Sequence, residues 1–146
     1  MDGFSRVINY YQNTIVALAL TDDGSKILSV SRDLTARIWN LGKQVLDPIH
    51  LQNLLLASGR NVQELVLAGH TNRVYGAAMT GDGKLAITGS EDQTARVWNV
   101  EDGRLIAAFT DDHPITTCAI AGEKTFLLGD LMGRIHFLQL EFDNNL

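Results

Sequence analysis

The sequence has few of the residues on which several classes of site depend. Among its 146 residues is one cysteine, Cys118, which excludes an internal disulfide and fits a reducing compartment. No cluster of Lys or Arg occurs in a chain of formal net charge −5, which argues against a nucleic-acid partner. The longest apolar runs, 15–20 and 54–57, are far too short to cross a membrane, and the N-terminus has no signal-peptide pattern. We therefore expect a cytoplasmic protein with no membrane and no nucleic-acid partner.

The motifs that hold metals, phosphates and cofactors are missing as well. The four histidines have no His-x-x-x-His spacing, and no glycine-rich phosphate loop occurs, so we expect no metal and no cofactor. Two acidic pairs, Asp22-Asp23 and Asp111-Asp112, are typical of turns in which a carboxylate caps the backbone.

What the sequence does have is a series of short strands separated by turn residues, most clearly between residues 69 and 109. Runs rich in apolar and β-branched residues alternate there with Gly and Asp, as expected for hairpins. The runs are 74–80, 85–89, 94–100 and 104–109, and the turns are Gly81-Asp82-Gly83, Ser90-Glu91-Asp92 and Asp102-Gly103. This segment predicts one small four-stranded antiparallel sheet.

The same pattern occurs three times along the chain. Alignment of Trp39 with Trp98 also superimposes other residues of the two segments: Ser31 on Ser90, Asp33 on Asp92, and Thr35-Ala36-Arg37 on Thr94-Ala95-Arg96. A third, weaker copy places Gly129-Asp130 on Gly89-Ser90 and Leu138 on Trp98. Repeats of this kind are typical of solenoids and propellers.

The best repeat closely resembles that of the WD-repeat β-propeller family. The residues that carry the resemblance are Gly69-His70, Gly81-Asp82-Gly83, Gly89-Ser90-Glu91-Asp92 and Thr94-Ala95-Arg96-Val97-Trp98-Asn99. The resemblance implies an all-β fold: a propeller segment of about three four-stranded blades, forming one domain over 1–146. Its expected parts are an outer strand at 4–11, a blade at 14–68, a blade at 73–109, and a blade at 115–141 that lacks its outer strand.

The first of these blades is longer than one repeat, and the excess lies at 45–61. Residues 50–57 are rich in good helix formers, and Leu51, Leu54 and Leu55 form a stripe at helical spacing. We expect a short helical insertion here, which either packs on a neighbouring blade or docks a partner.

The resemblance also implies a structural hydrogen-bond network. In the family, the positions of His70, Ser90, Asp92 and Trp98 form a chain from the indole through a hydroxyl and an imidazole to a carboxylate. The partial counterpart in the first blade consists of Ser31, Asp33 and Trp39. Each polar group in such a chain is half buried, so the chain would fix the loop before the first strand to the turn between the second and third.

A hydrolase that uses His70, Ser90 and Asp92 is the enzymatic alternative, because these residue types also form catalytic triads. Ser90, however, lies within a predicted strand and lacks the Gly-x-Ser-x-Gly turn that exposes a nucleophilic serine. The structural role is favoured, and we expect no enzyme.

In the resembled family, one rim of the propeller is the usual docking surface. Here Arg32, Arg73, Tyr75 and Glu91 occupy that rim, and Arg and Tyr are common at binding hot spots. We expect a non-catalytic scaffold that presents this rim to a protein or peptide. The alternative is a truncated propeller fragment with a purely structural role.

The last repeat, 129–141, adds an expectation about the setting. It looks like the final repeat of bacterial proteins in which a signalling NTPase precedes a WD-repeat sensor. This resemblance implies a signalling or sensor assembly.

Three blades are too few for a closed ring, because propellers typically have four to eight. The spare strand at 4–11 and the missing outer strand of the last blade are complementary, and an unpaired edge strand needs a cover. We expect a homodimer with six blades, or completion of the ring by a larger chain.

Overall fold

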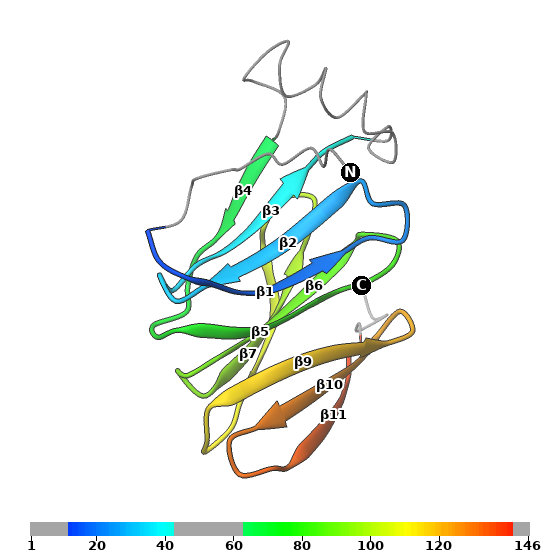
Figure 1. Ribbon diagram of the computed structural model, residues 1–146. Coiled ribbons are helices and arrows are strands. Elements are labelled where there is room, and N and C mark those ends of the chain that lie inside the picture. Colours follow the sequence, from blue (N-terminus) through cyan, green and yellow to red (C-terminus); the bar gives the residue numbers. More distant parts are fainter. Residues whose placement is uncertain (1–11, 43–62, 142–146) are drawn as a thin grey trace, which may run out of the picture.

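The computed structural model of the protein describes residues 12–42 and 63–141, which form three antiparallel β-sheets (Figure 1). Blade 1 has the order β1-β2-β3-β4, blade 2 the order β5-β6-β7-β8, and blade 3 the order β9-β10-β11. The strands are β1 Ile15–Leu20, β2 Lys26–Ser31, β3 Ala36–Asn40, β4 Gln63–Leu67, β5 Val74–Met79, β6 Leu85–Ser90, β7 Thr94–Asn99, β8 Leu105–Thr110, β9 Ile115–Ala121, β10 Thr125–Asp130 and β11 Ile135–Gln139.

The predicted all-β class is confirmed, since the described ranges contain strands and turns and no helix. None of their segments is therefore a helix long and apolar enough to span a membrane. The predicted outer strand at 4–11 and the predicted helical insertion at 45–61 lie outside the described residues, so both stay predictions.

The hairpin turns follow from short polar residues placed at fixed offsets. In the β5–β6 turn, Asp82 accepts hydrogen bonds from the hydroxyl of Thr80 at 2.7 Å and from the backbone N–H of Lys84 at 3.0 Å. Gly83 then adopts a φ of 69°, which a residue without a Cβ reaches at no steric cost. The β1–β2 turn repeats this arrangement with Thr21, Asp23 and Gly24.

Each blade has an irregular residue near the start of its first strand. The register skips Val16 in β1, Tyr75 in β5 and Thr116 in β9, so each of these residues lies in a β-bulge. Bulges bend a strand and change the direction of a side chain, and they are common next to functional sites.

Two apolar layers join the three blades, which stack one on the next with β1, β5 and β9 side by side (Figure 1). Leu28 and Ile38 of blade 1 pack with Met79 and Trp98 of blade 2 in the first layer. In the second layer, Ile87 and Val97 of blade 2 pack with residues of blade 3: Ile115, Phe126 and Leu128. Both buried apolar clusters of the described residues are thus contacts between consecutive blades.

Gly76 sets the closest approach between β5 and β9. A Cβ at this position would lie 2.9 Å from the backbone N of Cys118 and 2.9 Å from the carbonyl carbon of Thr117. Glycine is therefore required at this position because any side chain would collide with the backbone of β9, and not because of an unusual φ. Cys118 itself lies in an apolar setting, where burial raises the pKa of its thiol to about 12, so it is not a reactive nucleophile.

Candidate functional site

Most of the site residues predicted from the sequence gather on one rim of the blades, which we call the loop rim; Trp39, Trp98 and Tyr75 lie within strands. It consists of the loops that enter β1, β5 and β9 (12–14, 70–73, 111–114) and the turns β2–β3, β6–β7 and β10–β11 (31–35, 90–94, 130–134). In every blade a backbone N–H of the turn donates to a carbonyl of the entering loop. The pairs are Arg32 to Thr14 at 3.0 Å, Glu91 to Arg73 at 2.9 Å and Leu131 to Pro114 at 3.0 Å.

In blade 2 a chain of side-chain hydrogen bonds connects the core to this rim. The indole Nε1–H of Trp98 donates to the hydroxyl of Thr88 at 2.8 Å. That hydroxyl lies 2.7 Å from Nε2 of His70, whose Nδ1 lies 2.9 Å from Oδ2 of Asp92. Thr88 is fully buried and His70 and Trp98 nearly so, which means that none of these groups could exchange its partner for water.

The protonation of this chain follows from its acceptors. An ionised Asp92 can only accept, so Nδ1 of His70 carries the proton and Nε2 accepts the hydroxyl hydrogen of Thr88. Burial lowers the pKa of His70, although the neighbouring Asp92 opposes this, and the imidazole is neutral at neutral pH. Burial raises the pKa of Asp92, but hydrogen bonds from Thr94 and from the backbone N–H of Thr71 outweigh it and lower that pKa to about 2.

The prediction that Ser90 supplies the hydroxyl of this chain is wrong. Trp98 pairs with Ala86 across the β6–β7 ladder, so its indole reaches the diagonal neighbour Thr88, and Ser90 lies two residues further along the strand. The Ser90 hydroxyl instead donates to the carbonyls of Asn72 at 3.1 Å and Arg73 at 2.9 Å. Ser90 thus also fastens the entering loop to the turn, but through the backbone.

In blade 1, too, the indole bonds to a different hydroxyl from the predicted one. The Nε1–H of Trp39 donates to Ser29 at 2.7 Å, and not to Ser31. Ser31 accepts the backbone N–H of Asp33 at 3.1 Å, and Asp33 accepts both the backbone N–H and the hydroxyl of Thr35. Of the three residues predicted for this blade, Ser31 and Asp33 therefore organise the turn, and Trp39 belongs to a separate buried pair.

The hydrolase alternative fails on the same geometry. His70 faces Thr88, so a triad with Ser90 does not form. Thr88, His70 and Asp92 do have the distances of a nucleophile, a base and an orienting acid. The Thr88 hydroxyl is fully buried, however, and accepts the Trp98 N–H, so no substrate carbonyl reaches it. These three residues form a structural chain.

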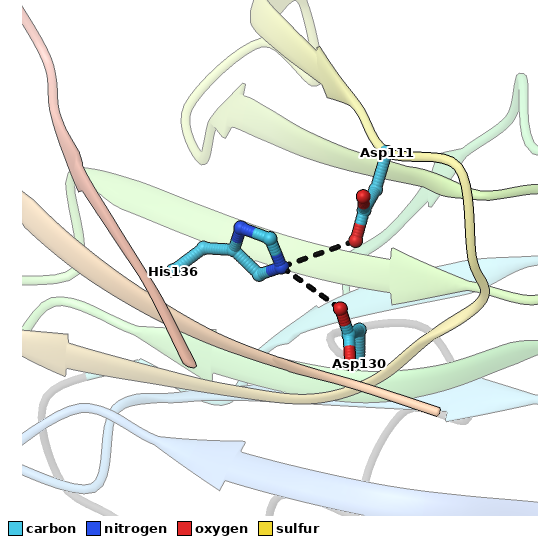
Figure 2. Close-up of side chains that lie close together, drawn as sticks. All are labelled: Asp111, Asp130 and His136. Atoms are coloured by element: carbon cyan, nitrogen blue, oxygen red, sulfur yellow. Dashed lines mark hydrogen bonds and ion pairs between the residues drawn. The ribbon is translucent and has the colours of Figure 1, made fainter. Parts of the chain in front are cut away.

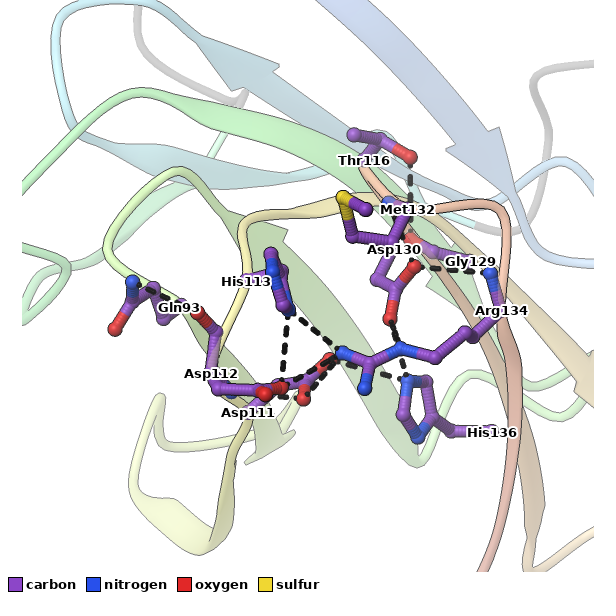
Figure 3. Close-up of polar contacts among 10 residues, drawn as sticks. All are labelled: Gln93, Asp111, Asp112, His113, Thr116, Gly129, Asp130, Met132, Arg134 and His136. Atoms are coloured by element: carbon purple, nitrogen blue, oxygen red, sulfur yellow. Dashed lines mark hydrogen bonds and ion pairs between the residues drawn. The ribbon is translucent and has the colours of Figure 1, made fainter.

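In blade 3 an ionic cluster takes the place of this chain (Figure 3). Leu138 and Leu128 occupy the positions of Trp98 and Thr88, so the indole and the hydroxyl are absent from these two positions. Asp130 stands at the position of Ser90 and is buried. Its carboxylate accepts the backbone N–H groups of Met132 and Arg134, each at 2.9 Å, and the side-chain Nε–H of Arg134.

The guanidinium of Arg134 extends this cluster to the loop between blades 2 and 3. Its Nη2 donates to Asp111 at 3.0 Å, to Asp112 at 2.7 Å and to Nδ1 of His113 at 2.9 Å. Hydrogen bonds from Arg134 lower the pKa of Asp112, and the carboxylates in turn raise the pKa of Arg134. The sequence alone does not indicate this cluster, because its members come from a loop and a turn that only the fold brings together.

His136 lies against two carboxylates of the cluster, as Figure 2 shows. Its Nε2 is 3.1 Å from Oδ2 of Asp111 and 3.0 Å from Oδ2 of Asp130. The three groups are close enough to offer one metal ion three ligand atoms. The same Oδ2 of Asp130 already accepts the Nε–H of Arg134, so the guanidinium is the cation that this structure places there. The cluster thus serves as a clamp between the loop and blade 3.

Three of the four predicted docking residues, Arg32, Arg73 and Glu91, lie on the loop rim, and Tyr75 lies beside it near the start of β5; all four side chains are partly or fully accessible. Arg32 is exposed, and the Arg73 guanidinium lies 3.9 Å from Glu91. Interactions with Tyr75 and with Glu91 raise the pKa of Arg73. In the β10–β11 turn of the same rim, the apolar side chains of Leu131 and Met132 are 65% and 63% exposed.

The opposite rim has a groove of about 1320 Å³ that is lined by residues of all three blades. Its charged lining residues balance one another: Lys26, Lys84, Arg104 and Lys124 against Glu64, Asp82, Glu101 and Glu123. A balanced lining gives no concentrated positive field, so the groove lacks the electrostatic feature with which proteins attract a phosphate backbone.

The sequence matches the family described as "WD domain, G-beta repeat" at residues 5–40 and 61–99, about half of the chain. The chain belongs to this family. A solved structure described as "Crystal structure of RRP9 WD40 repeats" superimposes with a TM-score of 0.65 at 22% identity, over 85% of this chain and 34% of that one. This likeness shows the propeller fold of the blades.

Several curated proteins are similar over part of their length. Apoptotic protease-activating factor 1 of Rattus norvegicus is 32% identical over 96 residues, U3 snoRNP-associated protein-like YAO of Arabidopsis thaliana 26% over 119, and mitochondrial division protein 1 of Schizosaccharomyces pombe 31% over 125. The alignments cover 66%, 80% and 80% of this chain, but 6%, 23% and 19% of the relatives. The chain therefore spans a quarter or less of these relatives. WD-repeat relatives of this kind point to a scaffold for protein–protein interaction.

Proposed function

We propose that the protein is a non-catalytic WD-repeat scaffold that uses the loop rim to dock a protein or peptide. The observation that carries this proposal is the contrast between the two kinds of polar group on the rim. The hydrogen-bonding groups of Thr88, His70 and Trp98 are buried and paired with one another, whereas Arg32 and Arg73 are exposed. The accessible groups are thus left for binding.

The composition of the accessible rim favours a protein partner. Tyr75 lies in the bulge of β5 and interacts with Arg73, so its ring is held close to the rim by a fixed irregularity of the strand. Leu131 and Met132 add exposed apolar surface beside the polar residues. Aromatic, arginine and methionine side chains are enriched at protein interfaces, and an apolar patch with a polar border is typical of a docking site.

The setting that we propose is a cytoplasmic signalling or sensor assembly of a bacterium. Two similarities support it: the likeness of residues 129–141 to the last repeat of NTPase-coupled WD-repeat sensors, and the match to apoptotic protease-activating factor 1, whose name describes the activation of a protease. We also propose that further blades complete the described ones, either from a second copy or from a larger chain.

Paired variants test the rim. The immobilised protein, its Arg73→Ala and Tyr75→Ala variants, and an Arg104→Ala control on the opposite rim are compared for the proteins that they retain from an extract of the source cell. A partner of the rim is retained by the wild type and the control and is lost, about tenfold or more, from both rim variants. A retained set that is the same for all four proteins would contradict the proposal.

A further inference from the structure

The turn between β2 and β3 contains a leucine in a backbone conformation that leucine rarely adopts. Leu34 has a φ of 76°, in the left-handed region, where the Cβ of a bulky residue is crowded by its own backbone. The equivalent residues are Gln93 in blade 2, with a φ of 69°, and Gly133 in blade 3, with a φ of 80°. Glycine adopts this φ without strain. The turn itself therefore gains nothing from a leucine, and the reason for Leu34 lies in its side chain.

The side chain of Leu34 belongs to the rim surface and not to a buried layer. It is 39% exposed and is not among the residues that form the two apolar layers. In blade 2, the side-chain amide of Gln93 at this position donates to the carbonyl of Asp112, in the loop that enters the next blade, at 3.2 Å. A leucine has no polar group for such a bond. Leu34 thus adds apolar surface to the loop rim where blade 2 has a polar link between blades.

This turn lies where blade 1 meets blade 2. The residues that flank the turn, Val30 and Ala36, pack in the same apolar layer as Val74 at the start of β5. Arg73 and Tyr75 precede and follow Val74 in the chain. The turn and the two docking residues of blade 2 therefore share one stretch of the loop rim, at a junction whose two blades are both present.

Arg32 in the same turn is an exposed cation whose side chain has no hydrogen bond or ion pair within the described part of the chain. Its backbone N–H donates to Thr14, which is uncharged, whereas the same two positions of blade 2 hold Glu91 and Arg73, 3.9 Å apart. The neighbouring carboxylate of Asp33 is engaged within the turn, where it accepts two hydrogen bonds from Thr35. Arg32 thus presents an uncompensated positive charge at the rim.

We propose that the partner of the loop rim presents an acidic side chain close to an apolar one, and that Arg32 and Leu34 recognise this pair. A carboxylate is the complement of an exposed guanidinium, which holds it through two parallel hydrogen bonds. An apolar side chain of the partner buries the exposed part of Leu34. The hydrogen bonds of Asp33 fix the turn before binding, so both side chains are presented from an ordered backbone.

Recognition by Arg32 and Leu34 rests on the proposed docking function and names the chemistry of its partner. These two residues lie in blade 1, whereas the Arg73→Ala and Tyr75→Ala variants that test the docking function lie in blade 2. If the blade 2 variants lose the partner and the blade 1 variants keep it, the docking function stands and this recognition fails. If all of them keep the partner, both fail.

The test is a selection from a displayed library of random linear peptides on the immobilised 146-residue chain, followed by affinity measurements on the best synthetic peptide. The selected peptides are expected to share an Asp or Glu that is adjacent to an apolar residue or one position away from it. Arg32→Glu should weaken binding of the peptide by about tenfold or more. Lys84→Glu, the same charge reversal at an 81% exposed side chain of the opposite rim, is the control and should leave the affinity unchanged.

A second variant, Leu34→Gly, separates binding from folding. Glycine adopts the φ of this turn without strain, so the midpoint of urea unfolding should stay at or above that of the wild type, while the affinity for the peptide falls by about fivefold or more. Gln93→Gly, a change to glycine at the equivalent residue of blade 2, should leave the affinity unchanged. A library that yields no peptide or only peptides without an acidic residue, or an unchanged affinity in either Arg32→Glu or Leu34→Gly, would overturn the proposal.

Discussion

Replacement of Thr88 by valine tests the hydrogen-bond chain of blade 2 without changing the volume of the side chain. Thr88 is fully buried, and its hydroxyl is the partner of two groups, the Nε1–H of Trp98 at 2.8 Å and Nε2 of His70 at 2.7 Å. The valine leaves both unpaired in a place that water does not reach. One buried unpaired group costs about 1–3 kcal/mol, and two that share a site are not fully additive, so we expect a loss of about 2–4 kcal/mol in the free energy of unfolding.

Urea unfolding at one fixed protein concentration measures this loss, because any assembly makes the apparent stability depend on concentration. Thr110→Val is the matched control: the same change on an exposed residue of β8 is expected to stay within about 0.5 kcal/mol of the wild type. The double variant Thr88→Val/Trp98→Phe should lose less stability than the sum of the losses in the two single variants, since both single changes remove the same hydrogen bond. A Thr88→Val variant as stable as Thr110→Val would show that the hydroxyl of Thr88 does not stabilise the fold through this chain.

Three further predictions concern pH, backbone contact and the ionic cluster. Because the pKa of His70 is lowered and that of Asp92 is lowered to about 2, the unfolded chain binds more protons, and the free energy of unfolding should fall as the pH drops below about 6.5 and again below about 4. Gly76→Ala should cost about 1–3 kcal/mol in urea unfolding, since the added Cβ meets the backbone of β9. Arg134→Met should lower the melting temperature more than Arg104→Met, because it leaves a buried carboxylate without its cation.

Each of these has a control or an outcome that contradicts it. His70→Gln should flatten the pH dependence between about pH 7 and 5, and an unchanged slope would show that another group titrates there. Gly133→Ala is the comparison for Gly76→Ala. It adds a Cβ that has no atom within 4 Å at a φ of 80°, so any loss of stability comes from backbone strain and not from a close contact. Equal melting temperatures for the two arginine variants would mean that the cluster contributes nothing to the fold.

The arrangement of the blades was predictable from the sequence because it depends on local signals. Asp82-Gly83 marks a turn, and the alternation of small and apolar residues on either side marks strands; the structure places β5 to β8 within a residue or two of the predicted runs. Trp39 and Trp98 identified the repeat, since a large aromatic residue at the same place in two sheets is hard to obtain by chance.

Local sequence signals could not predict which hydroxyl, that of Thr88 or that of Ser90, accepts the indole N–H of Trp98. Thr88 and Ser90 lie two residues apart on the same face of β6, so alternation alone does not distinguish them. The distinction depends on the register of the ladder, which pairs Trp98 with Ala86 and brings its indole towards Thr88. The match of Ser31 to Ser90 in the two repeats was real, but it reflects the backbone clamp of the turn.

The cluster in blade 3 shows a second limit. Asp111 and Asp112 have the sequence pattern of a solvated turn, and nothing near them in the chain points to Arg134. Only the folding of β9 to β11 brings the guanidinium within 3.0 Å of both carboxylates. Blade 3, which lacks the tryptophan and histidine of blade 2 at the matching positions, therefore connects its loop and turn through the ion pairs of Arg134. A residue-by-residue comparison with the other repeats does not reveal these ion pairs.

We propose that partners dock on the loop rim of a non-catalytic scaffold, and this docking can be mapped on the protein itself. Hydrogen–deuterium exchange of the protein, free and in complex with a partner that the Arg73 and Tyr75 variants fail to retain, maps the bound surface directly. We expect slower exchange at residues 70–75, 90–94 and 130–134, and no change at the turns 81–84 and 99–104 of the opposite rim. Slower exchange at those opposite turns, with the loop rim unaffected, would show that partners do not dock on the loop rim.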